Sequence, residues 1–177
     1  MINATSIFQK SLAHGLGLDL YARIMHEDPS SEVFQHDFKV YYRVRRNEKW
    51  RYLFYDLFCI ARTEKYSFEQ IITELYRRTG NIEASFSSKM LATIDASKPI
   101  WDQYVLQNLG LMLTGRTKEE KLHNAIILYD RIDSWYESYL STDEAKQNIH
   151  VFDLSLPVYT WISDTKKIDC LLWCNRA

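Results

Sequence analysis

Glycine and proline are scarce in this sequence, with five and three residues among 177. Both residue types interrupt helices and strands, so their scarcity excludes a loop-rich or disordered chain. Hydrophobic residues make up 46% of the sequence and aromatic residues 14%. This composition predicts a compact fold rich in secondary structure, and the chain length predicts a single domain spanning residues 1–177.

No charge of one sign dominates, since 22 Lys and Arg residues face 23 Asp and Glu residues. This balance excludes nucleic-acid binding through a global basic excess, so any such binding needs a local patch. No apolar run approaches the roughly 20 residues of a membrane-spanning helix, and the first residues carry no secretion-signal pattern. We therefore expect a soluble, cytoplasmic protein without a membrane partner, and the sequence sets no oligomeric state.

Cysteine is also rare, and its three positions are Cys59, Cys170 and Cys174. An odd number of cysteines without a CxxC pair argues against a disulfide framework. Cys170 and Cys174 share one helix face but have no nearby histidine, and the histidines of the chain are dispersed without ligand spacing. We therefore expect no metal ion, no cofactor and no hydrolytic triad.

Apolar residues recur at spacings of three and four in nearly every long segment, which predicts an all-α bundle of about seven or eight helices. The clearest helix starts are two capping boxes, Ser67 with Gln70 and Thr117 with Glu120. Residues 38–44 alternate between apolar and polar types, and we interpret them as helix or as an extended lead-in. Helices are expected over residues 6–13, 18–26, 50–63, 67–80, 87–94, 101–109, 117–139 and 163–173.

Asp102 is the most informative single residue. It follows the apolar run Pro99-Ile100-Trp101 at the expected start of a helix. Burying an unpaired carboxylate costs several kcal/mol, so a charge at this place is either a helix N-cap or a working group. Both interpretations stay open at this point.

The order of features from Ser88 to Leu106 resembles the helix-hairpin-helix DNA glycosylase superfamily. The shared features are a small-residue helix beneath a turn, an apolar pair, an aspartate, and a following helix with valine three residues on. The resemblance implies a glycosylase-like helical bundle, DNA as the partner, and Asp102 as the catalytic residue that stabilises the sugar cation when a base leaves. Residues 167–173 also resemble the ending of uncharacterised members of that superfamily.

The chain departs from the family pattern at three places. Residues 80–86 replace the Leu-Pro-Gly-x-Gly hairpin and contain one glycine and Glu83. The position of the family's lyase lysine falls near Ser85, and no four-cysteine cluster is present. The resemblance therefore implies a monofunctional glycosylase without a Schiff-base lysine and without an iron–sulfur cluster.

The best local basic patch lies between residues 39 and 52, where cations alternate with Tyr41, Tyr42, Trp50 and Tyr52. Cations suit phosphate contacts, and aromatic rings suit base stacking. The alternative is a solvated helix face whose aromatic residues turn to the core. Lys89 is a further phosphate candidate, with a solvated surface lysine as its alternative. The expected nucleic-acid-binding residues are Lys39, Arg43, Arg45, Arg46, Lys49, Arg51 and Lys89.

We therefore predict a DNA-binding, glycosylase-like protein of DNA repair, in which Asp102 helps to excise a damaged base. The competing hypothesis is a noncatalytic helical module that binds a protein partner, or a second copy of itself, through its aromatic-rich surface. Salt-sensitive DNA binding favours the first hypothesis, and salt-insensitive self-association favours the second.

Overall fold

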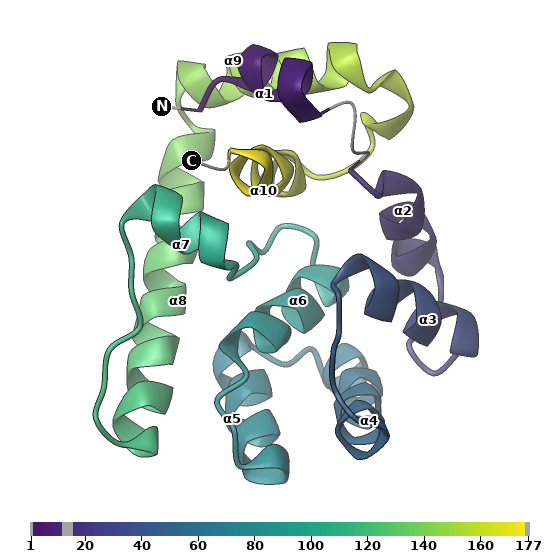
Figure 1. The fold of residues 1–177 in the computed structure, drawn as a ribbon, viewed down its shortest axis with the longest axis vertical. Coiled ribbons are helices and arrows are strands. Elements are labelled where there is room, and N and C mark those ends of the chain that lie inside the picture. The colour runs from purple at the N-terminus through teal and green to yellow at the C-terminus, as the bar shows by residue number, and fades with distance from the viewer. Residues whose placement is uncertain (1, 12–15, 176–177) are drawn as a thin grey trace. The chain divides into compact units, whose positions relative to one another are not determined.

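The structure is a computed structural model that describes residues 2–11 and 16–175. These residues form ten α-helices and one short 3-10 helix, with no strand, which confirms the all-α prediction (Figure 1). The helices group into two compact units. Unit 1 comprises Met1–Leu16 with Asp95–Ala177, and unit 2 comprises Gly17–Ile94. That these units make up a single domain stays a prediction.

Unit 2 is built from consecutive helices, and its core is rich in aromatic residues. The helix α2 packs against α3, and α5 packs against both α4 and α6. The Phe58 ring of α4 lies edge-on to Phe34 and Phe38 of α3, with centroids 5.2 and 5.6 Å apart. Edge-to-face pairs of this kind add to the free energy of burying the rings. The helices of unit 2 are α2 (Leu18–His26), α3 (Glu32–Tyr41), α4 (Glu48–Glu64), α5 (Phe68–Thr79) and α6 (Ala84–Ile94).

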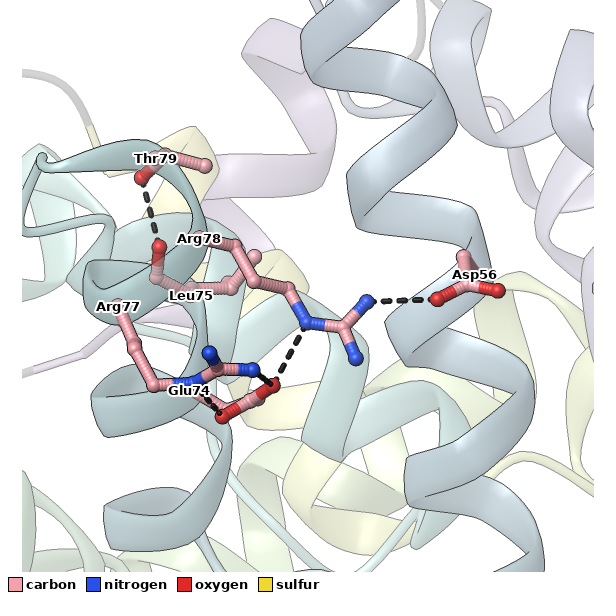
Figure 2. A network of polar contacts seen from close by, with 6 residues as sticks. All are labelled: Asp56, Glu74, Leu75, Arg77, Arg78 and Thr79. Atoms are coloured by element: carbon pink, nitrogen blue, oxygen red, sulfur yellow. Dashed lines mark hydrogen bonds and ion pairs between the residues drawn. The ribbon is translucent and has the colours of Figure 1, made fainter.

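Charged side chains join α5 to α4 in unit 2 (Figure 2). The Glu74 carboxylate accepts hydrogen bonds from Arg77 and Arg78 of its own helix at distances of 2.7–2.8 Å. Arg78 also donates to Asp56 of α4 at 2.6 Å. The hydrogen bonds from Arg77 and then Arg78 lower the pKa of Glu74 to about 2. The carboxylate is therefore charged at neutral pH, and its partner Arg78 bridges the two helices.

Unit 1 is organised around one helix that is buried along most of its length. The helix α10 packs against α1, α7, α8 and α9, and Figure 1 shows it among them. Its residues 165–172 are all buried, including Lys166, Lys167 and Asp169. The N-terminal segment joins the same unit, since the Ala4 N–H donates to Asn148 of α9 at 3.1 Å. The elements of unit 1 are α1 (Ala4–Ser11), α7 (Gln103–Leu109), α8 (Lys118–Leu140), α9 (Asp143–Ser155), the 3-10 helix η2 (Pro157–Tyr159) and α10 (Asp164–Cys174).

Most of the predicted helices are confirmed, with small shifts at their ends. Both capping boxes form, at the starts of α5 and α8. The prediction for residues 18–26 matches α2, and Gly80 and Gly110 end α5 and α7 in the left-handed conformation. The expected end of the first helix, Ala13, lies outside the described residues.

The prediction of seven or eight helices is wrong, because α3 and α9 form as well. The apolar–polar alternation near residue 38 belongs to the end of α3, where Phe38 and Tyr42 are buried while Lys39 and Val40 are exposed. Phe38 and Tyr42 lie four residues apart and therefore share one helix face. Apolar residues at this spacing, with polar residues between them, can look like the alternation of a short strand. The helix α6 starts at Ala84 rather than at residue 87, and α7 starts at residue 103 rather than at residue 101.

Candidate functional site

Asp102 lies in unit 1 and caps the N-terminus of α7. Its Oδ1 accepts a hydrogen bond from the Tyr104 backbone N–H at 2.9 Å, and the side chain is half-buried. This bond satisfies one of the backbone donors that the first turn of a helix leaves without a partner. The capping role is therefore observed, and the catalytic role stays a prediction.

Asp169 of α10 is a buried carboxylate of unit 1 that is not among the predicted site residues. It is 4% exposed, and its Oδ1 accepts hydrogen bonds from the Tyr136 hydroxyl and from the Ile100 N–H. Its Oδ2 has no donor among the described residues. Burial raises the pKa of Asp169 to about 6, against the lowering effect of Lys166 and of the Tyr136 hydrogen bond.

Asp169 belongs to a buried polar cluster that holds the segment ahead of α7. The Tyr129 hydroxyl of α8 donates to the Pro99 carbonyl at 2.8 Å. Desolvation raises the pKa of Tyr129 and of Tyr136 well above the ordinary value. The charge of Asp102 contributes to the raised pKa of Asp169. Pro99 is thus bonded to α8 and Ile100 to α10, directly ahead of the Asp102 cap.

The predicted basic patch lies in unit 2, on the end of α3, the loop 42–47 and the first turns of α4. We call residues 39–51 the cationic segment. Among the described residues, no carboxylate forms an ion pair with Lys39, Arg45 or Lys49. Arg51 is half-buried and donates to the Arg46 carbonyl at 2.7 Å. The exposed cations of the segment are Lys39, Arg43, Arg45, Arg46 and Lys49.

The aromatic residues of the cationic segment are mostly turned into unit 2. Tyr42 is 9% exposed and Trp50 is 7% exposed, so neither ring offers a face for base stacking. Tyr52, next to the segment, is the exception, with 72% of its surface exposed. The alternative interpretation, in which the aromatic residues turn to the core, is therefore confirmed for Tyr42 and Trp50.

Arg46 is held by a buried carboxylate. Glu83 is 4% exposed and accepts hydrogen bonds from Trp50 Nε1 at 3.0 Å and from Arg46 at 2.9 Å. The Arg46 guanidinium also lies 5.6 Å from the ring centroids of both Trp50 and Phe86. A buried carboxylate needs such donors, because leaving it unpaired is costly. Arg46 thus has a structural task in addition to its predicted phosphate contact.

Glu83 also determines how the loop between α5 and α6 contacts the rest of unit 2. This loop, residues 80–83, lies within the segment in which the sequence lacks the glycines of a phosphate-binding hairpin. The Glu83 carboxylate faces inward to Arg46 and Trp50, and a negative charge at this place repels a phosphate. Glu83 therefore ties the loop to the start of α4 and to the residue Arg46 ahead of it.

Lys89 is half-buried on α6 and contacts aromatic rings. Its Nζ lies 5.2 Å from the Phe86 centroid and 5.6 Å from the Tyr42 centroid. Contacts over a ring face attract an ammonium group. Lys89 therefore has ring contacts that the sequence did not predict, and both its solvated-lysine alternative and its phosphate contact stay predictions. In unit 2 Lys89 is brought next to Tyr42 of the cationic segment, whereas Asp102 belongs to the other unit.

The described part of the chain shows neither a metal-binding group nor a membrane-spanning helix. Its histidine, cysteine, aspartate and glutamate side chains form no group suited to a metal ion. None of its helices combines the length and apolar character needed to cross a lipid bilayer. Comparisons with family models, curated proteins and solved structures found no match for this chain. A function is therefore inferred from the contacts described above.

Replacing Arg46 with alanine removes one of the donors of the buried Glu83. We expect Arg46→Ala to lower the free energy of unfolding by about 1–3 kcal/mol, the cost of an unsatisfied buried group. The matched control Arg45→Ala removes an exposed neighbour and should change it by less than about 0.5 kcal/mol. Urea unfolding followed by circular dichroism measures both values, and equal losses in the two variants contradict the assignment.

Asp169 makes the stability of unit 1 depend on pH. Its pKa of about 6 in the folded state lies above the ordinary 3.8, so the folded state binds the proton more tightly than the unfolded state. The contribution to stability is present below about pH 4 and is lost as the pH rises to about 6, with a total of about 3 kcal/mol.

The isosteric variant Asp169→Asn cannot ionise, so we expect it to lack this loss. The difference in free energy of unfolding between variant and wild type should grow from pH 4 to pH 6 in favour of the variant, by about the same 3 kcal/mol. Thermal and urea unfolding at several pH values measure the difference. Parallel pH profiles of the two proteins rule out a titrating Asp169.

Proposed function

We propose that the chain binds DNA along its sugar–phosphate backbone through the cationic segment, and that Asp102 takes part in removing a damaged base. The observation that supports the binding step is the exposure of Lys39, Arg45 and Lys49 without an ion pair to a described residue. Phosphate contacts need cations that the protein's own carboxylates have not neutralised. These three residues meet that requirement.

The loop 42–47 supports the proposal because it is anchored. Arg43 has a φ of 52°, a left-handed conformation by which the chain leaves α3. Val44 is 4% exposed, while Arg43 and Arg45 on either side of it are exposed. Val44 therefore fixes the loop to unit 2, and the arginine on either side of it is exposed.

The buried rings of the cationic segment favour duplex DNA as the ligand. Proteins that bind single strands combine cations with aromatic rings on which successive bases stack. Here Tyr42 and Trp50 are buried, whereas the neighbouring Tyr52 is widely exposed. A surface that offers cations with few stacking rings suits the regular phosphates of a duplex.

Asp102 is the proposed group for base excision. A flipped nucleotide needs a carboxylate near its sugar as the base departs. The half-buried Asp102 uses Oδ1 for the helix cap, while Oδ2 forms no hydrogen bond to a described residue. One oxygen thus holds the side chain in place, and the other remains for a substrate.

The binding step is tested by the salt dependence of duplex affinity. We expect wild type to bind an undamaged duplex at low salt, and the triple variant Lys39→Gln, Arg45→Gln, Lys49→Gln to bind more weakly. The slope of log affinity against log salt concentration should fall by about 0.9 for each phosphate that the variant no longer neutralises. Lys65→Gln, an exposed lysine of unit 2 outside the segment, serves as the control and should leave the slope unchanged.

A wild-type protein that binds no duplex at low salt overturns the DNA proposal. Sedimentation of the same samples distinguishes the competing hypothesis, because a noncatalytic interaction module self-associates without dependence on salt. Fluorescence anisotropy of a labelled duplex provides the affinities.

The catalytic step is tested by variants that separate capping from chemistry. Asparagine is as good an N-cap as aspartate, whereas alanine at this position costs about 1 kcal/mol. We therefore expect Asp102→Asn to keep the stability of wild type and to lose base excision. Asp102→Ala should lose base excision and also about 1 kcal/mol of the free energy of unfolding. Release of bases from duplexes carrying deaminated, alkylated or oxidised bases measures the activity. If wild type binds these duplexes and releases no base from any of them, excision is refuted and binding stands.

A further inference from the structure

Arg46 differs from three neighbouring cations of the cationic segment because its charge is paired inside unit 2. Its Nη2 donates to Oε2 of Glu83 at 2.9 Å, and 43% of the Arg46 side chain is exposed against 4% of the Glu83 side chain. Lys39, Arg45 and Lys49 form no ion pair with a described residue. The pair therefore lies where the interior of unit 2 meets the solvent, with the cation on the outer side.

The Glu83 carboxylate is fixed in place by contacts with α4 and α6. Its Oε1 accepts a hydrogen bond from Trp50 Nε1 of α4 at 3.0 Å. The Glu83 backbone carbonyl accepts from the Ser87 N–H of α6 at 2.8 Å, and the centroids of the Phe86 and Trp50 rings lie 4.9 Å apart. The carboxylate cannot turn to the solvent without taking the acceptor from a buried indole N–H, which is costly.

The Arg46 side chain is held as well. Its guanidinium carbon lies 5.6 Å from the ring centroids of both Trp50 and Phe86, and contacts over a ring face attract a cation. The Arg46 backbone carbonyl accepts a hydrogen bond from Arg51 at 2.7 Å. The pairing with Glu83 is therefore part of a packed arrangement.

The strengths of two competing attractions decide which anion neutralises Arg46. At a given distance, two charges attract each other about fourfold more strongly at the effective dielectric constant of about 20 near a protein surface than at about 80 in water. Salt screens exposed charges further and screens buried ones much less. Glu83 is buried and in direct contact, whereas a DNA phosphate approaches from the solvent. Arg46 therefore remains neutralised by Glu83 when a duplex arrives.

We propose that Glu83 limits the affinity of the cationic segment for DNA, because it neutralises Arg46 and so keeps the charge of Arg46 from the phosphates. This inference rests on the proposed DNA binding and names a residue that regulates it. In wild type, Lys39, Arg45 and Lys49 then carry the phosphate contacts, and Arg46 releases no counterion. Fewer neutralised phosphates give a weaker complex that depends less on salt.

The isosteric variant Glu83→Gln tests the proposal, because it removes the charge and keeps the shape. Its amide has one acceptor oxygen in place of two, so Trp50 and Arg46 no longer each have an oxygen. We expect the variant to bind an undamaged duplex severalfold more tightly than wild type. The slope of log affinity against log salt concentration should steepen by about 0.9, the value for one further phosphate. The matched control Glu48→Gln removes an exposed carboxylate of the same segment and should steepen the slope by much less.

A second variant shows whether Arg46 is the source of the gain. The double variant Arg46→Gln, Glu83→Gln should lose the additional slope of about 0.9 that Glu83→Gln gains. A double variant that keeps the steeper slope overturns the proposal. Weaker binding by Glu83→Gln also overturns it, because Glu83 then positions Arg46 for a phosphate. Circular dichroism verifies that each variant keeps its helices.

The wild-type protein provides a test that needs no substitution. In isotope-labelled protein, the guanidinium resonances of Arg46 should keep their positions when a duplex is added, while those of Arg45 should shift. Movement of the Arg46 resonances on binding overturns the proposal. A wild type that binds no duplex overturns the proposed DNA binding and this inference together, whereas wild-type binding with an unchanged slope in Glu83→Gln overturns this inference alone.

Discussion

Each unit buries at least one carboxylate, and the donors that a buried carboxylate requires help to determine where the helices meet. In unit 2, Glu83 accepts from Trp50 and Arg46 and so joins the α5–α6 loop to α4. In unit 1, Asp169 accepts from Tyr136 and from the backbone of Ile100. Losing a donor to a buried charge costs more than most single contacts contribute. These donors therefore cannot shift without disturbing the whole unit to which they belong.

The sequence predicts the parts of the fold that depend on local signals, and it does not predict the contacts that depend on tertiary packing. Capping boxes and C-terminal glycines act over a few neighbouring positions, so their signals at α5 and α8 hold without knowledge of the rest. The contacts of Asp169 are set by packing, because residues 165–172 are buried on every face and follow no one-sided pattern. A local signal for Asp169 did exist, since it stands within the run Ile168-Asp169-Cys170-Leu171-Leu172. The cost of burying an unpaired carboxylate, which singles out Asp102, singles out Asp169 as well.

The sequence likewise predicts one part of the candidate site, the exposed cations, and does not predict another, the buried aromatic rings. The positions of the cations in the cationic segment are visible in the sequence, because exposure is the default for lysine and arginine. The fate of the interleaved rings is not visible, since Trp50 turns inward toward Glu83, which lies 33 positions further along the chain. Arg46 is bound to the same carboxylate across 37 positions. Only the tertiary structure shows that Arg46 binds a buried carboxylate whereas Arg45 forms no ion pair with a described residue.

Unit 1 is assembled from both ends of the chain, since Ala4 of α1 is bonded to Asn148 of α9 and α1 also packs against α10. Unit 2 lies between these ends in the sequence and is continuous. During synthesis on the ribosome, unit 2 has all its own residues available for folding as soon as residue 94 has emerged. The N-terminal helix must wait for residues near the other end of the chain, so unit 1 completes late and unit 2 has the opportunity to fold first.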